Sequence, residues 1–142
     1  MARKPGRRGK FEEAQAPFAL DAPDLQAVFA AYGWCCGFTG LDLRTEATAD
    51  PAGALLRLAP LGPITLGAVI PASLEAIYAY ERGHLALGSR CQFLVALDRI
   101  DPEFLERLNP IGRLTLPADT AFAPRADLLK VHRAAFVEGL ID

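Results

Sequence analysis

The side chains of this chain that could carry acid–base, metal or phosphate chemistry are few and widely spaced. The sequence has two histidines, His84 and His132, and three cysteines, Cys35, Cys36 and Cys91. Histidine can exchange a proton near neutral pH, and histidine together with cysteine thiolates can hold zinc. A zinc site built from either adjacent cysteine with Cys91 and His84 is conceivable. No Cys-x-x-Cys pair supports it, and small buried cysteines are the commoner case, so we expect no resident metal or cofactor.

The remaining polar residues offer one phosphate-binding candidate and no well-supported catalytic pair. Arg57 could bind a phosphate through its bidentate guanidinium, although a surface salt bridge with Glu75 or Glu81 is the simpler interpretation. The two glutamates lie six residues apart, so they do not share a helical face at ideal spacing. We interpret His132 as a structural histidine of the last helix. The sequence also lacks a glycine-rich phosphate loop, a serine nucleophile elbow and a helical His-Glu-x-x-His pattern.

The first element that must position these residues is a helix before the glycine-rich stretch at 33–40. The segment that begins Asp-Ala-Pro-Asp at residue 21 has a capping aspartate and a proline near the first turn, as helix starts do. Leu25, Val28, Phe29 and Tyr32 then form one apolar stripe. Gly33 is a natural end for this helix.

Further along the chain, short strands and helices alternate. Apolar spacing and turn residues predict a tight turn or hairpin over 34–43, a loop over 44–53, a strand over 54–58, a turn over 61–65 and a strand over 67–70. The same signals then predict a helix from Pro71 to Gly83, a hairpin from strands 84–87 and 92–97, a helix over 101–108, an extended segment over 112–117 and a helix over 125–138. Within the helix after Pro71, Leu74, Ile77 and Tyr78 have apolar helical spacing. Trp34, Tyr78 and Tyr80 could stack on bases, but their apolar neighbours favour the core. The order predicts an α+β fold, because regular βαβ alternation is missing.

Composition supports one domain with a basic arm. The chain has 142 residues, 51% of them hydrophobic and 23% charged, which suits a single folded core. No apolar run reaches the roughly 18–20 residues that span a bilayer, so we expect no membrane partner and a cytoplasmic location. The net charge of −2 hides five basic residues within residues 1–10 and no acidic ones. We expect a flexible arm over 1–20 and one domain over 21–142.

Residues 32–41, Tyr-Gly-Trp-Cys-Cys-Gly-Phe-Thr-Gly-Leu, contain the pattern Tyr-Gly-x-x-Cys-x-x-Thr-Gly-Leu. This pattern resembles the entry to the nuclease core of HNH-type restriction endonucleases of bacteria. A second block, from Leu-Arg-Leu-Ala-Pro at 56–60 to Gly-His-Leu at 83–85, is similar to that core. A third, from Gly-Arg-Leu-Thr-Leu-Pro at 112–117 to the His-Arg-Ala-Ala-Phe at 132–136, is similar to the closing segment. Together the blocks cover most of residues 24–137.

The resemblance implies a degenerate ββα-metal-like core with flanking helices and a C-terminal helix. In the family, a hairpin delivers a catalytic histidine and the following helix carries a metal-binding histidine. Here the catalytic position is Arg57, and the family's Asn-Gly is Leu66 and Gly67. The metal-binding position falls on Glu75, or on Ile77 if the alignment gap is placed earlier. An arginine cannot act as a base near neutral pH, since its pKa exceeds about 12, so we expect ordinary HNH hydrolysis to be lost.

Three functions follow as hypotheses. The leading one is a catalytically inactive HNH-like protein retained for binding DNA or a protein partner. An alternative is an active metal-dependent endonuclease or phosphodiesterase with a displaced site that uses Glu75, His84 and a metal. A third is a structural or homo-oligomerisation module. The nucleic-acid-binding candidates are Arg3, Lys4, Arg7, Arg8, Lys10 and Arg57.

Overall fold

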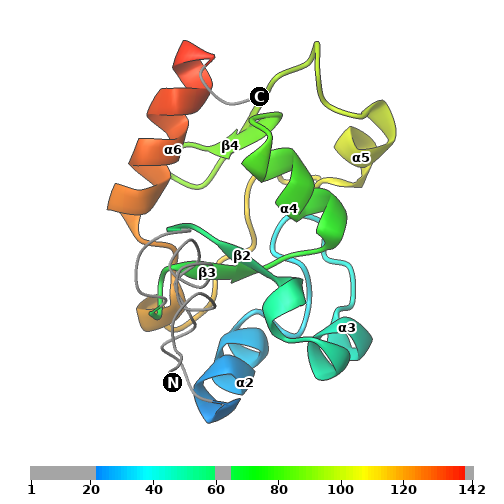
Figure 1. Ribbon diagram of the computed structural model, residues 1–142, viewed down its shortest axis with the longest axis vertical. Coiled ribbons are helices and arrows are strands. Elements are labelled where there is room, and N and C mark those ends of the chain that lie inside the picture. The colour runs from blue at the N-terminus through cyan, green and yellow to red at the C-terminus, as the bar shows by residue number, and fades with distance from the viewer. Residues whose placement is uncertain (1–21, 60–64, 140–142) are drawn as a thin grey trace, which may run out of the picture.

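The computed structural model describes residues 22–59 and 65–139, which form a mixed α+β fold (Figure 1). In chain order the elements are α2 (Ala22–Ala31), α3 (Arg44–Ala49), η1 (Ala52–Ala54), β2 (Leu55–Arg57), β3 (Val69–Pro71), α4 (Leu74–Glu81), β4 (Leu85–Leu87), β5 (Phe93–Val95), α5 (Pro102–Arg107), η2 (Thr120–Phe122) and α6 (Ala126–Glu138). The predicted α+β class is confirmed. The predicted arm over 1–20, its basic residues and the capping Asp21 lie outside the described residues. Among the helices of the described ranges, none has the length and apolar character needed to cross a membrane.

Helix α2 ends where the sequence predicts, at the start of the glycine-rich stretch. Its last residue is Ala31, and Gly33 and Trp34 both adopt a positive φ, 66° and 61°. Val28 and Phe29 are buried on the inner face of the helix, and the Trp34 ring stacks on Phe29 with centroids 5.5 Å apart. The two left-handed residues therefore turn the chain back, so that the tryptophan covers the end of its own helix.

The prediction of a loop over residues 44–53 is wrong. It forms the short helix α3, followed by the 3-10 turn η1. Its polar composition conceals the helix because only Ala47 is buried. Leu43, four residues before Ala47, is also buried.

Strands β2 and β3 form an antiparallel hairpin in which Leu55, Leu56 and Arg57 face Pro71, Ile70 and Val69. The two predicted strands are thus confirmed. Pro71 was expected to open the next helix, and this is wrong, because it closes β3. Ser73 is the helix cap instead, and its hydroxyl accepts a hydrogen bond from the Ala76 amide at 3.2 Å. Serine caps helices well, whereas proline is tolerated at a strand end.

The β2–β3 hairpin separates two apolar clusters. Side chains along a strand point alternately to opposite faces. Leu55 and Val69 belong to a smaller cluster beneath α2, while Leu56 and Ile70 belong to the larger core. The hairpin is therefore buried on both faces, and every residue of β3 is buried.

The second hairpin and the C-terminal helix complete the larger core. Strands β4 and β5 pair antiparallel, with Leu85 opposite Val95 and Leu87 opposite Phe93, which confirms the predicted hairpin. The segment 112–117 runs beside it, and the Leu114 amide donates to the Cys91 carbonyl at 2.9 Å. Helix α6 packs along β4 (Figure 1). As a result, the C-terminal helix lies on the far side of the core from α5.

The tight turn before β3 yields a stability prediction. Gly67 has a φ of 83°, and a Cβ there would lie 2.9 Å from Arg125 Cγ and 3.1 Å from the Ala123 carbonyl oxygen. Gly112 also has a positive φ, 80°, but open space around it. Substitution of Gly112 by alanine should cost about 1 kcal/mol from backbone strain alone. Gly67→Ala should lose roughly 1–3 kcal/mol more, because the added methyl overpacks the turn.

Urea unfolding of the two alanine variants beside the parent protein measures both losses. Equal losses in the two variants would show that the Gly67 turn tolerates a side chain and would contradict the packing described here.

Candidate functional site

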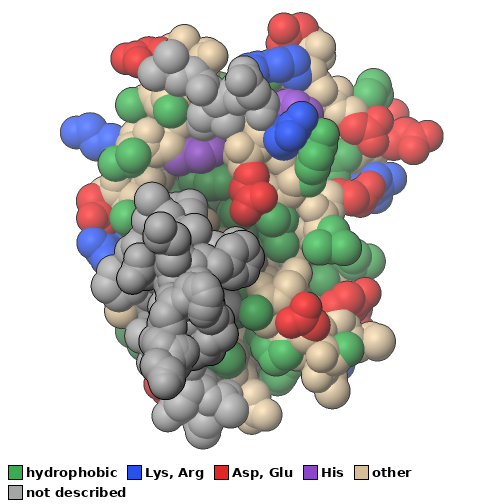
Figure 2. Space-filling model, in the orientation of Figure 1, with side chains coloured by type: hydrophobic (Ala, Val, Ile, Leu, Met, Phe, Trp, Pro, Cys, Tyr) green, Lys and Arg blue, Asp and Glu red, His purple; other side chains and the backbone are tan. Residues whose placement is uncertain are grey.

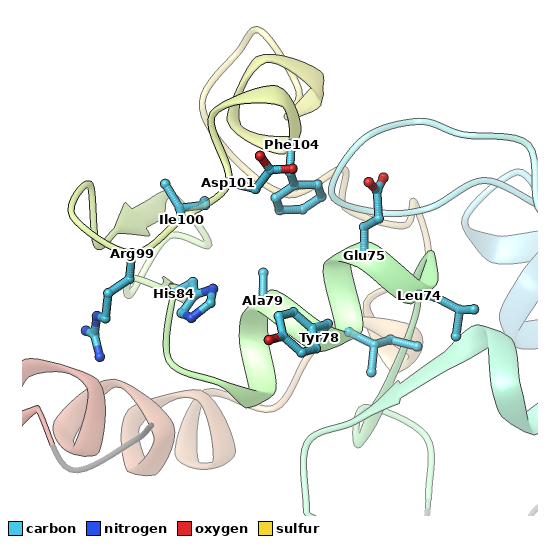
Figure 3. Close-up of a pocket in the computed structure, with 10 residues that line it drawn as sticks. Leu74, Glu75, Tyr78, Ala79, His84, Arg99, Ile100, Asp101 and Phe104 are labelled. Atoms are coloured by element: carbon cyan, nitrogen blue, oxygen red, sulfur yellow. The ribbon is translucent and has the colours of Figure 1, made fainter.

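A pocket of about 730 Å³ lies between α4 and the β5–α5 segment (Figure 3). This volume falls within the roughly 300–1,000 Å³ of typical small-molecule sites. Its lining combines apolar and charged side chains: Leu74, Glu75, Ile77, Tyr78, Ala79, His84, Arg99, Ile100, Asp101 and Phe104. Because the lining comes from two separate stretches of chain, the pocket exists only once α4 and α5 are both in place.

Helix α4 lines the pocket with the face that the sequence assigned to the core. Ala76, Ala79 and Tyr80 are its buried residues. Leu74 and Tyr78, on the other side, are 76% and 54% exposed. The expectation that Tyr78 is a core residue is therefore wrong. The small alanines on the buried face let the helix approach the core closely, which leaves the larger apolar side chains of α4 for the pocket.

The facing wall comes from the end of the β5–α5 connection and from α5. Ile100 and Phe104 are buried, and Figure 3 shows the Phe104 ring directed toward α4. Asp101 caps α5 by accepting a hydrogen bond from the Glu103 amide at 3.4 Å, with Pro102 at the first helical position. The Asp-Pro start that the sequence predicts thus fixes the helix that carries Phe104.

The charged groups of the pocket lie at opposite ends. Glu75 stands at one end, while His84 and Arg99 stand at the other (Figure 3). Glu75 forms an ion pair with Arg107 of α5, outside the pocket lining. Its negative charge is therefore already partnered at the surface.

His84 lies in a positively charged environment. Its ring meets the Tyr78 ring edge-on, with centroids 5.8 Å apart. The Arg82 guanidinium lies over that same tyrosine, 5.2 Å from the ring centroid. Partial burial lowers the pKa of His84, and the charges of Arg99 and Arg82 lower it further. The neutral imidazole is therefore favoured near pH 7.

The residues of the displaced-site hypothesis share this pocket but do not meet in it. Glu75 and His84 lie at its two ends (Figure 3). Across residues 22–59 and 65–139, no group of three or more His, Cys, Asp or Glu side chains is close enough to hold a metal ion. The conceivable zinc ligands are likewise apart. The Cys36 thiol packs 3.9 Å from the Ser73 hydroxyl, and burial raises the pKa of Cys91, which disfavours its thiolate.

The positions at which the sequence departs from the HNH pattern divide between two places. Arg57 is half-buried at the end of β2, and Leu66 precedes the turn at Gly67. Glu75 and Ile77 lie on α4 and line the pocket. Glu75 lines three pockets, and Arg57 is absent from all three. Of the two acids suggested as partners of Arg57, Glu75 pairs with Arg107 instead.

His132 has the structural role that the sequence predicts. Its ring stacks on Tyr80, with centroids 3.6 Å apart and planes 10° from parallel. Its Nε2 lies 2.7 Å from the Tyr80 carbonyl oxygen and donates to it, since a carbonyl can only accept. The neutral ring then has no proton on Nδ1, which is buried and has no hydrogen-bond partner in the described part of the chain. Burial lowers the pKa of His132, and the bond to Tyr80 only partly opposes this.

Sequence reasoning missed Arg99, Ile100, Asp101 and Phe104 as site residues. The only local signal was the Asp-Pro helix start at 101–102. Their meeting with α4 is a long-range contact that no local pattern encodes.

Comparison of the chain with protein-family models, with curated proteins and with solved structures gave no match.

The lowered pKa of His132 predicts a loss of stability in mild acid. An unfolded histidine titrates near pH 6.5, whereas the folded ring stays neutral below that. As the pH falls from about 6.5 toward the folded pKa, the unfolded state takes up more protons. The free energy of unfolding should therefore decrease, by at most about 1.4 kcal/mol per pH unit. Urea unfolding at pH 7.5 and at pH 5.5 measures the change.

His132→Phe keeps an aromatic ring but cannot be protonated, so its stability should vary less with pH than that of the parent. His84→Gln is the control for the other histidine. A parent-like pH dependence in His132→Phe would contradict the assignment.

Proposed function

We propose that this chain is a non-hydrolytic binding protein built on a degenerate HNH-type core. The observation that carries the proposal is the order β2, β3, α4, a hairpin followed after two residues by a helix, with Arg57 at the end of β2. This is the order of elements that the ββα-metal core of the resembled family requires. The position expected to hold a catalytic base holds a permanent cation.

The chemistry of the chain's own residues supports loss of hydrolysis. A general base needs a pKa near the working pH, and the guanidinium of Arg57 does not lose its proton near neutrality. Neither histidine can replace it within this unit. His84 lies after the end of α4, and its ring meets the Tyr78 ring. His132 belongs to α6, and its Nε2 is hydrogen-bonded to the Tyr80 carbonyl oxygen.

The pocket between α4 and α5 supports binding as the retained activity. Its apolar walls and its few charged groups at the ends are the usual make-up of a ligand site. On the face shown in Figure 2, acidic and basic side chains of the described residues are interspersed with hydrophobic ones. A partner with apolar surface therefore matches this face better than a polyanion does.

DNA binding is the second candidate, and one specific observation favours it. Residues 1–10 contain five basic side chains and no acidic one, and together with Arg57 they could neutralise phosphates. In this version the arm supplies most of the affinity and Arg57 a single additional contact.

A plasmid-nicking assay with Mg²⁺, Mn²⁺ or Zn²⁺ tests the loss of hydrolysis. Purified protein should nick supercoiled DNA no faster than its Arg57→Ala variant prepared in parallel, because neither has a base in the hairpin. Any trace of contaminating nuclease would appear equally in both preparations. Metal-dependent nicking that a chelator stops and that Arg57→Ala abolishes would refute the proposal.

Salt dependence tests the DNA candidate separately. If the arm binds phosphates, the affinity for a short duplex should fall steeply with salt, with a log–log slope of roughly −0.9 for each phosphate contact. Deletion of residues 1–10 should flatten the slope and abolish most binding, whereas Arg57→Ala should change the slope by about one contact at most. No measurable binding at low salt would eliminate this candidate.

A further inference from the structure

The α4–α5 pocket is one part of a longer groove. Two smaller hollows, of about 240 and 300 Å³, adjoin it at the start of α4. Leu74 lines the pocket and the first of these hollows, Glu75 lines all three, and Leu41 lines the two smaller ones. The groove therefore runs from His84 along α4 to the end of the glycine-rich stretch.

Large apolar side chains stand exposed along this groove. Leu41, Leu74 and Tyr78 are 53%, 76% and 54% exposed. Leu74 and Tyr78 lie four residues apart on α4, so they share one face of the helix. A contiguous apolar surface with polar residues around it is typical of a protein interaction site.

The side of the molecule that forms the groove is acidic. Residues 42–50, 74–82 and 98–107, which contribute the α3, α4 and α5 parts of its lining, hold nine acidic and four basic side chains, a net charge of −5. All thirteen are exposed. The rest of the described residues hold four acidic and six basic side chains, a net charge of +2. Figure 2 shows acidic side chains over α3 and α5, with hydrophobic ones between them.

Most of these nine acids are not neutralised by the chain itself. Ion pairs engage Asp42 with Arg44 and Glu75 with Arg107. Among residues 22–59 and 65–139, the other seven acids of this side form no ion pair. A uniform negative field of this kind attracts a basic partner and speeds its encounter with the surface.

The walls of the groove indicate the form of the partner. The residues that line it belong to α3, α4, α5, η1 and their connections, and none of them lies in one of the four strands described. An extended peptide that adds to a sheet needs an exposed strand edge, whereas an amphipathic helix needs a groove with apolar contacts. A helix therefore fits this surface better than a strand does.

We propose that the groove along α4 binds a basic amphipathic helix of a partner protein. The apolar stripe of that helix lies against Leu41, Leu74 and Tyr78, and its lysine and arginine side chains face the acids of α3 and α5. The proposal rests on the proposed binding function and names the class of partner.

Calorimetric titration of the full-length chain with three amidated peptides separates the apolar stripe from the charge. The probe consists of two Leu-Lys-Lys-Leu-Leu-Lys-Leu repeats. One control peptide has glutamate in place of every lysine, and the other has serine in place of every leucine. The probe should bind at least about tenfold more tightly than either control, because each control lacks one of the two complementary features. Equal binding of the probe and the serine peptide would overturn the role of the apolar groove, and tighter binding of the glutamate peptide would overturn the charge assignment.

Two groove variants with matched controls locate the site. Leu74→Ser should weaken probe binding about tenfold, because the exposed leucine becomes buried in the complex. Val131→Ser is its control, since Val131 is 72% exposed on α6 and lies outside the groove. Glu46→Gln should weaken binding roughly two- to threefold, whereas Glu138→Gln, on α6, should not. Equal losses in Leu74→Ser and Val131→Ser would overturn the proposed site.

Three further results separate other occupants of the groove. Deletion of residues 1–10 should leave the affinity for the probe unchanged, and a tenfold gain would assign the groove to the basic segment of the chain itself. Sedimentation should give a monomer, and a dimer that Leu74→Ser dissociates would assign the groove to a second copy. The nicking assay decides the loss of hydrolysis independently, so failure of the probe to bind would overturn this partner class and leave that result intact.

Discussion

The buried ring of Tyr80 is the contact on which the placing of α4 depends. It stacks face to face on His132 of α6 and lies 6.4 Å from the ring of Phe38, in the glycine-rich stretch. Its own carbonyl accepts the His132 Nε2 bond. One residue of α4 therefore joins this helix to segments far away in both directions along the chain. Because the face of α4 that carries Tyr80 is held against the core, the face that carries Leu74 and Tyr78 is left to form the pocket.

A second constraint fixes the hairpin from which α4 begins. Asn109 donates through its side-chain amide to the carbonyls of Gly37 and Arg113, and its own amide donates to the Phe38 carbonyl. Gly37 in turn donates to the Pro71 carbonyl at the end of β3. These bonds tie together the three blocks on which the resemblance to HNH nucleases rests.

The parts of the fold that could be predicted are those with a local cause. The two hairpins, the stop at Gly33 and the Asp-Pro start of α5 follow from turn and capping residues. Helix α3 escaped prediction because a six-residue helix with one buried alanine has almost no apolar periodicity. The pocket could not be foreseen, because Leu74, Ile77 and Tyr78 have the spacing of a core face. Which face of α4 is buried is decided by contacts of Tyr80 with α6 and with Phe38, both distant in sequence.

The central claim is that the chain binds through the outer face of α4 and not at the position of the lost base in β2. Amide chemical-shift mapping of the full chain with 1-octanol, a neutral apolar probe, is the measurement. The largest changes are expected at Tyr78, His84 and Phe104, with Arg57 and Val69 unaffected. Changes concentrated on Arg57 and Val69, with the pocket residues unmoved, would contradict it.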